Sequence, residues 1–351
     1  MLGELAVFYL FLGGAGAGAM VVCALLDLIV VKESFGNSLY EAGLSGAPLS
    51  RMVSYGMLVG LLCLVVGALS LLFDLGRIDR AITLFTSPSV SLLTLGAFAL
   101  VVLAACAAFL TIVRFVYLPE VARSLVFAVE IATVVFGLVV MVYTGLLLQG
   151  TGGVAFWNSP LLPVLFLLSS ASSGAALVFA AAFFVEADGR AMHVLRLLTR
   201  VDAVVIGCEA LCALVFVLLA NASDHLGVVE SLRTLFQGEA SLAWWAGFAL
   251  CGLVAPLAIE LALPRSSSGQ RAGLALAAVL VLVGAFCLRW SLVEAGVHRA
   301  PVLEEVPATT APFLNEAGSQ VRGIDLFVLD GTTYDFDGHD ITKTARMIET
   351  A

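Results

Sequence analysis

Long apolar runs separated by short polar stretches fill the sequence up to about residue 299. Eight runs are long enough to cross roughly 30 Å of hydrocarbon as helices. They cover residues 5–31, 51–73, 90–117, 124–148, 160–185, 201–220, 242–263 and 273–296. Membrane-spanning β-strands would instead alternate polar and apolar residues over about ten positions. The pattern therefore predicts an all-α integral membrane protein with eight transmembrane helices.

The composition excludes the soluble classes. Apolar residues make up 61% of the 351 residues and charged residues 12%, against about 45–50% and about 25% in soluble domains. The mean hydropathy is +1.07. A net charge of −9 leaves no basic surface for binding nucleic acid.

The cysteines and histidines argue against a metal or haem centre in this chain. All seven cysteines lie inside apolar runs and none forms a CxxC pair, so an iron–sulfur cluster is not expected. Cys208 and Cys212 are four residues apart, but buried cysteines usually act as small hydrophobic residues. None of the four histidines stands in the middle of an apolar helix, where a membrane haem b would need an axial ligand.

A weak internal repeat divides residues 1–299 into halves of about 1–150 and 151–299. The first and fifth helices both begin Leu-Phe-Leu and continue through small residues, about 155 residues apart. An offset of four helices predicts two parallel four-helix bundles. Small residues needed for helix packing would also account for the similarity.

The composition changes at about residue 300, where an acidic extramembrane tail (300–351) begins. Asp330-Gly331 could form the turn of a short β-hairpin. The tail is either a solvated segment or a strap that docks on a partner subunit, and the sequence leaves both open.

The distribution of Lys and Arg predicts the orientation. Nine basic residues lie near the membrane on the loops after odd-numbered helices, and five lie on the other side. The positive-inside rule then places the odd-numbered loops in the cytoplasm and both termini on the outer face.

Glycines in the first helix have two possible explanations. Gly14, Gly16 and Ala19 match the spacing of a dinucleotide-binding loop, but no strand precedes them, so that function is rejected. Gly14 and Gly18 instead predict close helix packing. A flat opening for a ligand ring is the alternative.

Polar side chains near the outer ends of several spans are candidate ligand contacts, although membrane-interface anchoring would explain each of them. They are Tyr9 in the first span, Asp74 and Arg77 after the second, Tyr143 and Gln149 near the end of the fourth, and Arg289 in the eighth. Arg289 stands several residues inside its span and must be paired or snorkel to the interface.

Carboxylates within the spans predict a proton route, because such groups often mark one. Glu130 and Glu209 are the favoured members, while Asp27 and Glu260 are close enough to helix ends to be ordinary. Glu294, near the outer end of the last span, completes the expected route.

Four strings occur in the order FDLGRIDR, YTGLLL, FWNSPLLPVLFLLSSASSG and LRWSLVEAG. Together they resemble the NrfD-like family, which includes the membrane subunit of polysulfide reductase, over residues 5–298. The resemblance implies a quinone-reactive membrane anchor without haem or metal in the bacterial cytoplasmic membrane. Such an anchor exchanges electrons between menaquinone or ubiquinone and a four-cluster, ferredoxin-like iron–sulfur subunit. That partner serves a molybdopterin oxidoreductase or a multihaem cytochrome.

By the YTG motif, Tyr143 corresponds to a quinone-site tyrosine. Relatives carry polar residues, including a histidine, on the first helix, where this chain offers only Tyr9. An anchor that lacks a quinone site is therefore one alternative. A secondary transporter is another, because paired repeats and midplane acids suit that class. Apart from Pro256, however, the prolines cluster at helix ends, which counts against a transporter.

Overall fold

The computed structural model describes residues 4–30, 48–74, 92–116, 121–150, 154–185, 188–223, 225–262, 267–297, 327–329 and 332–334. The chain divides into two units, Met1–His298 and Arg299–Ala351. The first unit holds all the long helices, and the second holds a short hairpin.

Eight helices of the first unit are long and apolar enough to cross a membrane, which confirms the predicted number. They are α1 (Glu4–Ile29), α2 (Pro48–Asp74), α4 (Leu92–Phe115), α5 (Arg123–Gln149), α6 (Leu161–Phe183), α7 (Gly189–Asn221), the π-helix η4 (Ala243–Val254) continued by α9 (Ala255–Ala262), and α10 (Ser267–Gly296). The 3₁₀-helix η3 (Ala155–Trp157) and the short helix α8 (Leu226–Gln237) connect spans.

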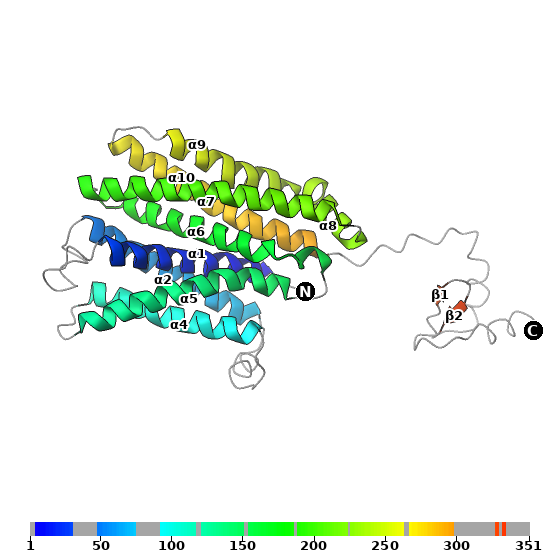
Figure 1. Cartoon of the computed structure of the whole chain (residues 1–351), viewed down its shortest axis with the longest axis horizontal. Coiled ribbons are helices and arrows are strands. Elements are labelled where there is room, and N and C mark those ends of the chain that lie inside the picture. Colours follow the sequence, from blue (N-terminus) through cyan, green and yellow to red (C-terminus); the bar gives the residue numbers. More distant parts are fainter. Residues whose placement is uncertain are drawn as a thin grey trace, which may run out of the picture. The chain divides into compact units, whose positions relative to one another are not determined.

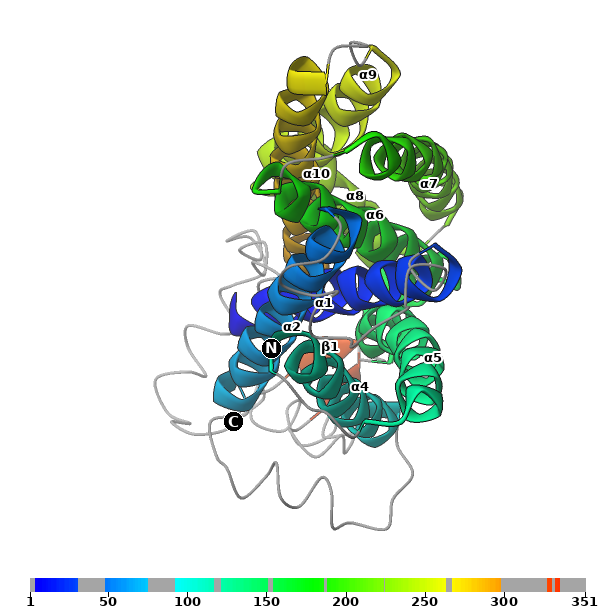
Figure 2. The same cartoon turned by 90° about the vertical axis from the view of Figure 1, so that its left-hand side faces the viewer.

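The eight spans form two bundles of four by their contacts, as predicted, and Figures 1 and 2 show the bundles side by side. One bundle contains α1, α2, α4 and α5, and the other contains α6, α7, η4–α9 and α10. Helices α1 and α6, the first of each bundle, pack against each other where the bundles meet. The N-terminus of α1 lies at the same end as α8 (Figure 1), and we call this end the Tyr9 end. The opposite end, where α1 finishes, is the Asp27 end.

Small residues allow α1 and α6 to approach closely. A Cβ atom on Gly18 would lie 3.2 Å from Cα of Gly174, and a Cβ on Gly174 would lie 2.5 Å from the backbone N of Ala19. Neither contact leaves room for a side chain. The prediction of close helix packing at Gly18 is therefore confirmed, and α1 is helical throughout Gly14–Ala19.

We expect Gly174→Val to lower the free energy of unfolding by about 3 kcal/mol, since the added carbons must push two backbones apart. Gly207→Val on α7 is the matched control, because a Cβ there meets no atom within 4 Å. Thermal unfolding of both variants in detergent measures the difference. Equal stability of the two variants would contradict the close packing of α1 on α6.

Helix α7 begins earlier than the sequence predicts. It has 33 residues and is therefore about 50 Å long, well beyond the thickness of the hydrocarbon core. The apolar pattern marks only the part from residue 201, because the first turns carry charged residues. The Asp188 carboxylate caps the true start by accepting a hydrogen bond from the Ala191 N–H at 2.8 Å.

The second unit contains two short antiparallel strands, β1 (Phe327–Leu329) and β2 (Thr332–Tyr334). Phe327 is opposite Tyr334, so the two residues between the strands are Asp330 and Gly331. This pairing is the hairpin that the sequence predicts. The rest of the tail lies outside the described residues, and its docking role stays a prediction.

Candidate functional site

Two tyrosines meet inside the first bundle at the Tyr9 end. Tyr9 of α1 and Tyr143 of α5 are both buried, and their phenol groups are direct neighbours. The ring of Tyr143 lies flat against Gly96 of α4, where any side chain would collide with it. Tyr9 Oη approaches Tyr143 but completes no hydrogen bond of regular geometry.

This tyrosine pair is suited to bind a polar ligand atom. A phenol has one O–H donor and also accepts hydrogen bonds. A buried polar group without a partner costs about 1–3 kcal/mol, so a ligand oxygen that bound Tyr9 would recover part of that cost. Because both hydroxyls are buried, such an atom has to separate the two phenols.

Arg289 of α10 lies on the other side of α1, in the second bundle. Its guanidinium donates four hydrogen bonds: to Leu10 O (3.0 Å), Ser169 Oγ (3.0 Å), Ala285 O (2.8 Å) and Ser170 Oγ (2.9 Å). The side chain is 0% exposed. Snorkelling to the membrane interface is therefore wrong for Arg289, because the protein itself supplies its acceptors.

Neighbouring helices make room for this cation. A Cβ on Gly14 would lie 2.5 Å from Ser170 Oγ and 3.0 Å from Arg289 Nη2, so only glycine fits there. The guanidinium carbon lies 5.2 Å from the ring centre of Phe166 and 6.0 Å from that of Phe11. Aromatic faces attract a cation at such distances. Gly14 thus serves the Arg289 site as well as helix packing.

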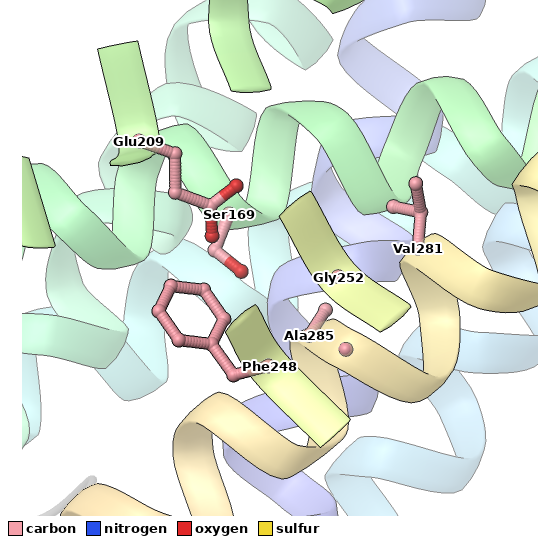
Figure 3. A pocket seen from close by; sticks show the side chains of 7 residues that line it. Ser169, Glu209, Phe248, Gly252, Val281 and Ala285 are labelled. Atoms are coloured by element: carbon pink, nitrogen blue, oxygen red, sulfur yellow. The ribbon is translucent and has the colours of Figure 1, made fainter. Parts of the chain in front are cut away.

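Glu209 of α7 is the acidic partner of this cluster. Its buried carboxylate points toward Ser169 (Figure 3) and interacts electrostatically with Arg289. Since Ser169 Oγ accepts from Arg289, its own O–H is available to Glu209. Arg289, Ser169 and Glu209 therefore form a polar line across three helices.

A narrow pocket adjoins Glu209 within the second bundle. The space between its lining atoms is about 170 Å³, part of it open to the outside, and none of it admits a water molecule. Its lining includes Ser169, Phe248 and Gly252 (Figure 3). Two of its walls come from η4 and α10, which touch closely because a Cβ on Gly252 would lie 2.9 Å from Cα of Gly284.

The other candidates lie apart from these clusters or outside the described residues. Asp74 and Gln149 are half-buried at the last positions of α2 and α5, and Glu294 is half-buried near the end of α10. Arg77 lies outside the described residues. The structure thus brings Tyr9 and Tyr143 together, and it places Arg289 with Glu209 in the second bundle.

The two remaining candidates of the proton route lie toward the Asp27 end. Asp27 forms a buried ion pair with Arg114 of α4, and Arg114 also donates to Ser50 Oγ at 3.4 Å and Ser54 Oγ at 3.3 Å. Glu130 is buried on α5. The ion pair occupies Asp27, which favours a structural role for it.

We expect Asp27→Asn to lower the free energy of unfolding by about 3–5 kcal/mol, because Arg114 would remain buried without its partner. Glu230→Gln on the exposed side of α8 removes an equal charge and serves as the control. Chemical denaturation in detergent gives both values. A stability for Asp27→Asn equal to that of the control would show that the ion pair does not stabilise the fold.

One buried carboxylate of the second bundle was not predicted from the sequence. Asp202 of α7 is 2% exposed, although the apolar pattern places it at the first positions of a span. The early start of α7 moves it 13 residues into the helix. The helix cap at Asp188, followed by Gly189 and Arg190, is the signal that could have revealed the longer helix.

Comparison with known proteins identifies the family. Residues 2–301 match the family described as polysulphide reductase, NrfD. The protein belongs to this family. The C subunit of polysulfide reductase from Wolinella succinogenes is 30% identical over 312 residues, which are 82% of this chain and 92% of that protein.

Two further relatives match about half of the chain. Protein NrfD of Escherichia coli is 34% identical over 169 residues, 48% of this chain and 52% of that protein. The NrfD homolog of Haemophilus influenzae is 27% identical over 180 residues, 50% of this chain and 54% of that protein. The family and the eight spans together make this NrfD-family chain a multi-pass membrane protein.

Proposed function

We propose that this NrfD-family chain is the quinol-binding membrane subunit of a respiratory oxidoreductase complex. It would exchange electrons between menaquinone or ubiquinone and an iron–sulfur partner subunit. The buried pair of Tyr9 and Tyr143 carries the proposal, because two phenols at one end of a bundle can hydrogen-bond a quinone oxygen. The name of the Wolinella relative, a subunit of polysulfide reductase, supports membership in a larger complex.

In this proposal the protein works together with partner subunits. Oxidation of a quinol releases two electrons and two protons, and both must be passed on. The electrons would leave at the Tyr9 end to a docked four-cluster iron–sulfur subunit. A molybdopterin oxidoreductase or a multihaem cytochrome would be the next member of the complex.

Protons would pass through the second bundle. Glu209 is the central group of this route, since Ser169 links its carboxylate to Arg289 at the Tyr9 end. Glu294, half-buried near the end of α10, would exchange protons with the outer surface. Asp74 and Gln149, half-buried at helix ends of the first bundle, would line the polar edge of the quinone site. Glu130 of α5 would carry protons within the first bundle, near the Asp27 end. Its ion pair makes Asp27 a poor carrier.

The test is purification of the tagged chain from its native membrane in mild detergent, followed by addition of a menaquinol analogue. We expect an iron–sulfur cluster to co-purify and its EPR signal to change on reduction, with a quinone-site inhibitor blocking that change. Clusters that quinol cannot reduce would instead favour an anchor without a quinone site.

A secondary transporter is the second candidate, and one observation favours it. Helix η4 is a π-helix that ends just before Pro256, beside the pocket at Glu209. Transporters often place an interrupted helix at their binding site. A protein that purifies alone, without cluster or quinone, and that drives solute uptake in vesicles would establish this function instead.

The orientation of the protein gives a further prediction. We expect a C-terminal alkaline phosphatase fusion to be active and a C-terminal green fluorescent protein fusion to be dark, since the basic loops should keep both termini on the outer face. Fusions placed after Arg190 should behave in the opposite way. Fluorescence at the C-terminus would reverse the proposed orientation and place the Tyr9 end in the cytoplasm.

A further inference from the structure

A second buried acidic cluster lies in the second bundle. Asp202 of α7 and Glu260 of α9 have neighbouring carboxylates, and they are 2% and 7% exposed. Ser172 Oγ of α6, in a residue that is 1% exposed, approaches Asp202. Three helices therefore bring five side-chain oxygens to one place.

All five oxygens lack partners. Neither oxygen of Asp202, neither oxygen of Glu260, nor Ser172 Oγ has a hydrogen bond of regular geometry. In the described part of the protein neither acid has an ion pair either. Two ionised carboxylates side by side in a protein interior repel each other and lose their hydration. A cation bound between the two carboxylates would remove this repulsion and give the unpartnered oxygens a ligand.

The other charged and titratable groups nearby do not supply that charge. On α7, Arg196 and Arg200 precede Asp202, but both side chains are exposed. Glu209, two helical turns farther along α7, is also acidic. The part of α10 from Ala272 to Leu288 carries only Cys287, and η4 carries only Cys251. Arg289, the buried cation of this bundle, is engaged at the Tyr9 end.

The change from π-helix to α-helix beside the cluster supports ligand binding. Pro256 has no N–H, so its position in the helix leaves a carbonyl of the preceding turn without an intrahelical donor. Pro256 and Glu260 are both buried and lie one turn apart, on one face of α9. Gly252, one turn before Pro256, lines the pocket at Glu209. The same face thus leads from the acidic cluster to Glu209.

We propose that Ser172, Asp202 and Glu260 form a binding site for one monovalent cation, a proton or a sodium ion. Both cations would neutralise one of the paired carboxylates. A proton would be shared between the two acids, whereas Na⁺ would also use Ser172 Oγ as a ligand, since hard cations prefer oxygen. The site goes beyond the proposed electron transfer and requires neither quinone nor a partner subunit.

The experiment is thermal unfolding of the purified full-length protein in detergent, in choline chloride and in NaCl, from pH 6 to pH 9. A cation that binds only the folded protein raises its unfolding temperature by mass action. Asp202→Asn and Glu260→Gln are the test variants, and Glu230→Gln on the exposed side of α8 is the control. We expect each test variant to need about tenfold more cation than the wild type, because each loses a charged ligand.

Three outcomes are possible, and each decides the proposal. Saturable stabilisation by Na⁺ that both test variants show only at about tenfold higher Na⁺ assigns a sodium site. No effect of Na⁺, with stabilisation on acidification that both variants show only about one pH unit lower, assigns a shared proton. Identical responses of the wild type, the control and the test variants to Na⁺ and pH would overturn the site. Should one variant fail to fold, the other carries the comparison, since each removes only one member of the pair.

The result is independent of the proposed function. The assay contains no quinol and no iron–sulfur partner, so a protein without quinone activity can still show cation binding. Conversely, a protein that shows no cation response can still reduce the partner cluster with quinol, so that experiment would still test the proposed function.

Discussion

Replacing Tyr143 by phenylalanine should lower kcat/KM for quinol oxidation about 100-fold without lowering stability. The magnitude distinguishes two roles for the phenol. Loss of one hydrogen bond is worth about 0.5–1.5 kcal/mol, or roughly 2- to 10-fold in binding. A group that also exchanges a proton with the reacting oxygen contributes about 100-fold or more. Stopped-flow reduction of the partner cluster by a quinol analogue measures the rate, and the split between kcat and KM shows which role applies.

Two further substitutions make this test specific. Tyr55→Phe removes a half-exposed phenol of α2 that packs against Phe115, away from the tyrosine pair, and should leave the rate unchanged. Tyr9→Phe removes the neighbour of Tyr143 and should raise KM severalfold, because Tyr9 supplies the unpaired buried hydroxyl. A rate for Tyr143→Phe equal to that of Tyr55→Phe would exclude the tyrosine pair from quinol chemistry.

The fold could be predicted from the sequence because the bilayer imposes a length on every span. Eight apolar runs correspond to eight helices, and Gly18, one of the two glycines predicted to pack helices, lies at the close contact of α1 with α6. The start of α7 could not be obtained in this way, since a helix that continues beyond the membrane loses its apolar signal at the interface. The predicted start of this span is therefore about 12 residues too late, and the apolar pattern puts Asp202 at the helix end.

The candidate site was predictable only in part. Tyr9 and Tyr143 are both indicated by their positions at span ends, and the fold brings them together. Arg289 belongs to a different cluster, because its direction depends on where the acceptors of α1 and α6 lie in space. Sequence position fixes the depth of a residue along its helix, but the side toward which it points depends on helix packing.

Arg289→Met should lower the free energy of unfolding by about 3–5 kcal/mol. The methionine fills much of the same volume but donates no hydrogen bond. It leaves Ser170 Oγ and Leu10 O without their donor, and Glu209 without its nearest cation. Arg233→Met on the exposed side of α8 is the control and should change stability by less than about 0.5 kcal/mol.

The double variant Arg289→Met with Glu209→Gln then separates charge from hydrogen bonding. Removing the stranded carboxylate should restore about 0.5–3 kcal/mol, which is the range of coupling energies for residues in one network. The rest of the loss belongs to the hydrogen bonds that α10 makes to α1 and α6. If the second substitution restores nothing, Arg289 acts only as a structural link between helices, and Glu209 carries its proton independently of this cation.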